Sequence, residues 1–125
     1  MLFSCNNKPE ILIADNKTDS ATSAIEISLS DLAKIYASLN GQFIVTKGQF
    51  SFLFEQVGIH DDALFASETD CFWLRFKNVM YEQEDKLSLL SGKRVTIKGK
   101  VNVNSKGHLG SYLASIDSVY FIKEE

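Results

Sequence analysis

The chain has 125 residues, of which 45% are hydrophobic, and it carries a formal net charge of −3. This length suffices for one domain that buries a core without metals or disulfides, and the composition excludes a disordered chain. The sequence contains no apolar run of about 18 residues that would span a membrane. The acidic balance disfavours a general nucleic-acid binder, because neutralising phosphates requires clustered Lys and Arg.

The N-terminus carries the residues Leu2-Phe3-Ser4-Cys5, followed by a polar stretch from Asn6 to Ser23. This start resembles the lipobox of bacterial lipoproteins, in which a small residue precedes the cysteine that receives the lipid. The resemblance implies lipidation of Cys5, a flexible tether over residues 1–23 and a domain over residues 24–125. It also implies a location in the bacterial cell envelope. A signal peptide needs a basic start and a longer apolar stretch than Met1–Phe3, so a cytoplasmic protein is the alternative.

The stretch from Ser28 to Leu39 has the spacing of an amphipathic helix, with apolar residues at positions 32, 35, 36 and 39. Ser28 or Ser30 can cap its N-terminus. Asn40-Gly41 ends it, because both residues tolerate the left-handed conformation found after a helix.

Two later segments, about Gln42–Glu55 and Lys93–Val103, are rich in alternating apolar residues and each contains Lys-Gly near its middle. Glycine inside a strand marks a bulge, a bend or a close backbone approach. We therefore expect Gly48 and Gly99 to let two long strands curve and pair with each other in a sheet that closes on itself.

We expect three further elements in the stretch between the two Lys-Gly strands, and one more strand after the second of them. We expect a turn over Gln56–His60, a hairpin of a short strand near residues 63–66 and a strand over Cys71–Lys77, and a short helix over Glu82–Leu90. A last strand runs from about Tyr112 to Lys123. In the strand over Cys71–Lys77 the period of two places Trp73, Arg75 and Lys77 on the outer face.

This order of elements, from Gln42 to Lys123, resembles that of the OB-fold. The pattern includes Val45-x-Lys47-Gly48 and Gly92-Lys93-x-Val95-x-Ile97-x-Gly99, and it is similar to that of domains related to tRNA-anticodon-binding modules. The resemblance implies a mainly β fold: a five-stranded Greek-key barrel with an N-terminal helix and a short helix between its third and fourth strands.

In OB-folds the ligand lies across the second and third strands, between the loops that flank them. Carried onto this sequence, that resemblance implies flanking loops over Gln56–Asp62 and Asn104–Gly110. The candidate binding face comprises Trp73, Arg75, Lys77, Lys98, Lys100 and His108. Trp73 either stacks on a ligand or covers the barrel by packing against the first helix.

Three functions compete at this point. The first is a non-enzymatic, lipid-anchored envelope module that binds a protein, peptide or glycan, with no cofactor and no metal. The second is a single-stranded nucleic-acid binder, in which Trp73 stacks a base and the cations meet phosphates. The third is a small hydrolase or metal enzyme built on His60, Asp61 and Asp62, although recognisable catalytic motifs are absent from the sequence.

Overall fold

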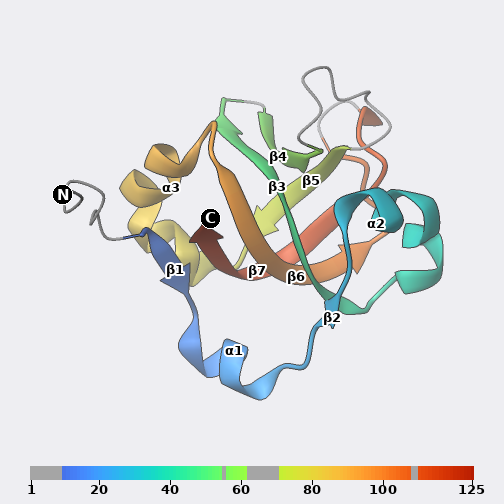
Figure 1. Cartoon of the computed structure of the whole chain (residues 1–125), viewed down its shortest axis with the longest axis horizontal. Helices are drawn as coiled ribbons and strands as arrows, with labels where there is room; N and C mark the ends of the chain where they lie inside the picture. Colours follow the sequence, from blue (N-terminus) through green and yellow to red (C-terminus); the bar gives the residue numbers. More distant parts are fainter. Residues whose placement is uncertain (1–9, 55, 62–70, 108–109) are drawn as a thin grey trace, which may run out of the picture.

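The computed structural model describes residues 10–54, 56–61, 71–107 and 110–125. Within these ranges the protein is mainly β, with seven strands in one sheet and three α-helices (Figure 1). The strands are β1 (Leu12–Ala14), β2 (Ile25–Glu26), β3 (Phe43–Leu53), β4 (Gln56–His60), β5 (Cys71–Phe76), β6 (Arg94–Asn102) and β7 (Ser115–Glu124). The helices are α1 (Asn16–Ala21), α2 (Leu29–Ile35) and α3 (Glu84–Leu90), with 3₁₀ segments η2 (Tyr36–Leu39) and η4 (Asn78–Gln83). The expected mainly β class is confirmed.

The strand pairings run in a ring. β3 pairs with β4, β4 with β5, β5 with β7, β7 with β6, and β6 again with β3. All of these pairs are antiparallel except β5–β7, which is parallel. The expected pairing of the two Lys-Gly strands is confirmed, with Gly48 opposite Val95 and Ile44 opposite Gly99. β1 and β2 add to the ring as short extra strands beside β7 and β3.

Both strand glycines lie where the backbone passes very close to neighbouring groups. A Cβ atom on Gly48 would lie 2.6 Å from the carbonyl oxygen of His60. A Cβ atom on Gly99 would lie 2.7 Å from Ile116 Cγ2, at the point where the β6–β7 register shifts. These distances leave no room for a side chain, so the two glycines permit close contacts that the sheet requires.

The core follows from the period of two along the strands, since the alternate apolar residues of β3, β5, β6 and β7 are buried. The rings of Phe50, Phe52 and Phe76 contact one another, with centroids 6.0 to 6.4 Å apart. Figure 1 shows α2 and α3 on opposite sides of the molecule. Each contributes two buried leucines to the core, which therefore extends beyond the sheet at two places.

The predicted first helix is confirmed as α2 followed by η2, and the Ser28 hydroxyl caps it by accepting from the Asp31 N–H at 3.2 Å. The predicted short helix is confirmed as α3, which η4 precedes. None of the helices in the described ranges is long and apolar enough to cross a membrane.

We expected a flexible tether over residues 1–23, in which the apolar patch Ile11–Ile13 either adds an edge strand or docks elsewhere, and the structure shows the edge strand. β1 pairs with β7, and Ile13 is 1% exposed within the core. The Asp15 N–H donates to the Tyr120 carbonyl at 2.8 Å, and the Asp15 side chain caps α1. The apolar run Ile11–Ile13 is short, but it buries enough surface to add a strand to the sheet.

The expected turn over Gln56–His60 is also wrong, because these residues form strand β4, paired on both sides. Gly58 is buried, and a Cβ atom there would lie 2.9 Å from the Phe72 carbonyl oxygen. The glycine thus serves a close approach between strands instead of a turn. The expected short strand at residues 63–66 lies outside the described residues.

Candidate binding surface on β4 and β5

The outer face of β5 carries Cys71, Trp73 and Arg75, since the alternate residues of this strand point into the core. Trp73 is half-buried and packs edge-on against Tyr112, with ring centroids 5.2 Å apart. Gly107 fits against the indole, because a Cβ atom there would lie 2.8 Å from Trp73 Cβ. Its φ of +69° also favours glycine. The Gly107 backbone therefore lies directly against the aromatic pair.

A cavity of about 220 Å³ opens on this face, and we call it the β4–β5 cavity. Its walls include Ser51, Gln56, Gly58, His60, Cys71 and Tyr112. Among the described residues its lining contains no Lys or Arg. The cavity therefore offers hydroxyl, amide, imidazole and thiol groups beside an aromatic ring, a lining suited to an uncharged polar ligand.

Tyr112 joins the cavity to the aromatic pair. Burial, and secondarily the nearby Cys71 thiol, raises the pKa of the Tyr112 hydroxyl above its usual value of 10. The hydroxyl is thus protonated at neutral pH and available as a hydrogen-bond donor or acceptor. The His60 ring contributes Nδ1 to a 2.9 Å hydrogen bond with the Asp61 carbonyl oxygen, which fixes its orientation.

Lys77 does not face this cavity; it binds the N-terminal segment. Its ammonium group donates to Asp15 Oδ2 at 2.8 Å and to Thr18 Oγ1 at 2.7 Å. The hydrogen bond from Lys77, with that from Thr18, lowers the pKa of Asp15 from 3.8 to about 2. Arg75 lies beside Lys77 in a wide hollow that also includes Asp117.

Lys98 and Lys100 lie on β6, and β7 separates this strand from β5. The Lys98 ammonium donates to Asp19 Oδ1 at 2.8 Å and lies 4.3 Å from the centroid of the Phe121 ring. The Lys100 ammonium lies 5.3 Å from the Phe43 ring centroid. The structure thus divides the predicted face: Trp73 and Arg75 share the outer side of β5, whereas Lys98 and Lys100 belong to β6.

Two of the predicted site residues, Cys5 and His108, lie outside the described residues, as does Asp62 of the proposed enzyme site. Among the described residues, no group of three or more His, Cys, Asp or Glu side chains could hold a metal ion. The His60 ring is hydrogen-bonded to a backbone carbonyl oxygen, that of Asp61.

None of the described residues that line the β4–β5 cavity belongs to the predicted binding face. Gln56 and Gly58 were assigned to a turn, and Tyr112 was placed in the last strand without a role. The available signal was the position of Tyr112 directly after the glycine-containing turn that the OB-fold resemblance places beside the ligand.

No family model, no curated protein and no solved structure matches this chain.

Proposed function

We propose that the protein is a non-enzymatic binding module on a five-stranded barrel of the OB-fold type. The ring of pairings β3–β4–β5–β7–β6 supports this assignment. So does the position of η4 and α3 between the third and fourth strands of that ring. An OB-fold binds across its second and third strands, and these are β4 and β5. The ligand would be a segment of a protein, a peptide or a glycan.

The observation that carries the proposal is the β4–β5 cavity beside the Trp73–Tyr112 pair. An aromatic pair offers a flat apolar surface to a sugar ring or an apolar side chain. The polar groups around the cavity can orient that ligand through hydrogen bonds. Because its described lining lacks Lys and Arg, the cavity favours an uncharged polar ligand over an anion.

We further propose that a lipid on Cys5 anchors the module in the bacterial cell envelope. The chain is held in the sheet from Ile11, whose carbonyl accepts from the Glu124 N–H at 2.9 Å. The residues from Cys5 to Ile11 span at most about 20 Å, so the domain would lie close to the membrane. Incorporation of radiolabelled palmitate into the protein, and its loss in Cys5→Ala, tests this anchor.

Single-stranded nucleic acid is the second candidate ligand, because Trp73 and Arg75 share one outer face. Base stacking contributes about 1–3 kcal/mol per base. The carboxylates of Asp15 and Asp19 bind Lys77 and Lys98, which weakens the basic character that such binding needs. Binding of a labelled oligonucleotide at about 50 mM salt, lost at higher salt, would favour this candidate.

Trp73 offers a direct test, because it is the only tryptophan in the chain. Soluble oligosaccharides and short peptides are titrated while its fluorescence is recorded. Gln56→Ala changes the cavity wall and should lower the affinity for a true ligand about tenfold. Lys86→Ala, at an exposed position of α3, should leave the affinity unchanged. Equal affinities for both variants, or no fluorescence change with any probe, would contradict the proposal.

A further inference from the structure

A second cavity, of about 370 Å³, opens beside β3 between β2 and the end of β4, and we call it the β3 cavity. It shares no described lining residue with the β4–β5 cavity. Its volume lies in the range of small-ligand sites. Apolar side chains of Ile27, Leu29 and Val45 form part of its wall.

Thr46 lines the β3 cavity and gives it an unsatisfied polar group. The residue is 2% exposed, and its hydroxyl has no hydrogen-bond partner among the described residues. A buried hydroxyl without a partner destabilises a folded protein. A ligand atom that came within hydrogen-bond distance of this hydroxyl would remove that cost.

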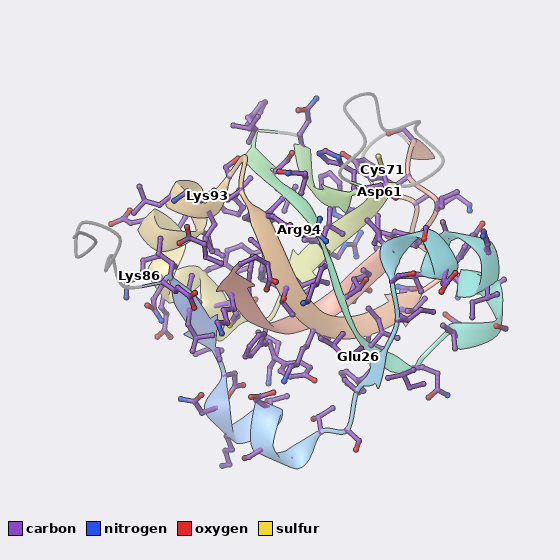
Figure 2. All side chains as sticks on the ribbon, in the orientation of Figure 1. Glu26, Asp61, Cys71, Lys86, Lys93 and Arg94 are labelled. Atoms are coloured by element: carbon purple, nitrogen blue, oxygen red, sulfur yellow. The ribbon has the colours of Figure 1, made fainter. Side chains whose placement is uncertain are left out.

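Charged residues of both signs surround the cavity and are arranged about β3. Glu26 lies on β2 opposite Val45, and Asp61 follows β4, whose last residue is opposite Gln49. The cations come from Lys47 on β3 and from Arg94 on β6, the strand on the other edge of β3. The side chains of Glu26, Asp61 and Arg94 can be followed in Figure 2. The two acids therefore lie along one edge of β3. The two cations lie on β3 itself and on β6, the strand at its other edge.

A carboxylate of the protein already lies beside one of the two cations. The Glu125 side chain lies 3.3 Å from the Lys47 ammonium and also accepts from the Thr96 hydroxyl. The Thr96 hydrogen bond, then Lys47 and Arg94, lowers the pKa of Glu125. The Glu125 carboxylate is thus paired with Lys47, one of the cations that line the cavity.

We propose that the β3 cavity binds a zwitterion of amino-acid to dipeptide size. The ligand carboxylate would join or replace Glu125 beside Lys47 and Arg94, and its ammonium group would face Glu26 and Asp61. Thr46 would supply a hydrogen bond, and the apolar wall would receive the side chain. This site is independent of the proposed function of the β4–β5 cavity.

The test follows backbone amide signals of the ¹⁵N-labelled full chain by NMR. The probes are leucine and the dipeptide alanyl-leucine, with N-acetyl-leucine and leucinamide as controls that each lack one charge. We expect leucine or the dipeptide to shift signals of residues 26–30 and 45–47, and both controls to bind at least about tenfold more weakly. Glu125→Gln should strengthen binding, because it removes the competing carboxylate.

Matched variants separate binding from folding. Thr46→Val keeps the volume but removes the hydroxyl, so we expect binding to weaken about fivefold while the fold becomes no less stable. Thr46→Ser keeps the hydroxyl and should retain binding. It therefore keeps the test valid if the Thr46→Val variant disturbs the strand. Lys86→Ala, at an exposed position of α3 outside both cavities, should leave the binding of these probes unchanged. Equal binding of a singly charged control, or unchanged affinity in Thr46→Val, overturns the proposal. So does the absence of any shift with leucine and with the dipeptide at about 10 mM, a concentration far above typical dissociation constants of ligand sites.

Discussion

The outer face of β4 and β5 and the outer face of β6 and β7 belong to one sheet, but their polar side chains have different roles. On β6 the ammonium of Lys98 is bound to Asp19 and lies over Phe121. On β5 the Trp73 ring meets Tyr112 next to a cavity lined by polar groups. Lys98 on β6 holds the protein's own N-terminal segment in place. Charge in a strand is therefore weaker evidence of a ligand than an aromatic pair beside a cavity.

The largest expected effect tests whether β1 belongs to the fold. Ile13→Ala removes a side chain that is 1% exposed, so it should reduce the free energy of unfolding by about 2–5 kcal/mol. Leu12→Ala, in the same strand but 49% exposed, should cost less than about 1 kcal/mol. Urea unfolding measures both. Equal and small effects would mean that the N-terminal segment is only loosely attached.

The two faces also differ in how far the sequence could predict them. The strands β3, β5 and β6 were foreseen because their apolar residues alternate over a sufficient length. β4 was missed because Gly58 was interpreted as part of a turn, although it permits the approach of the Phe72 carbonyl and Tyr112. A single sequence does not distinguish these two roles of glycine, since both need a residue without a side chain.

The candidate site was harder to predict than the fold. Trp73 and Arg75 follow from the period of two in a strand. The partners of Lys77 and Lys98 do not, because Asp15 and Asp19 lie 62 and 79 positions earlier in the chain. Tyr112 and Gln56 likewise line one cavity although they are far apart in the chain. Local pattern therefore identified which side chains face outward, and tertiary structure decided what they contact.

A medium effect is expected where a cation supports the N-terminal segment. Lys98→Met keeps the apolar part of the side chain but removes its ion pair with Asp19 and its contact with the Phe121 ring. We expect a loss of about 0.5–1 kcal/mol in the free energy of unfolding. Lys86→Met, on an exposed position of α3, changes the net charge equally and should stay within about 0.5 kcal/mol of the parent protein. Equal losses would show that net charge, and not the specific contact, is responsible.

The smallest expected effect is local and depends on pH. The pKa of Asp15 is about 2 in the folded protein, against 3.8 for the free group, because Lys77 and Thr18 hydrogen-bond to its carboxylate. This lowered pKa means that the stabilisation is complete above pH 4 and is lost as the pH falls towards 2. The protection factors of the α1 amides, which correct for the pH dependence of intrinsic exchange, should fall over that range, while those of the strands of the ring should not change. Asp15→Asn should remove the carboxylate's part of this pH dependence and raise exchange in α1 at pH 6. Unchanged exchange in α1 would mean that the Lys77–Asp15 contact does not hold the segment, and the cation would then be available on the face next to Arg75.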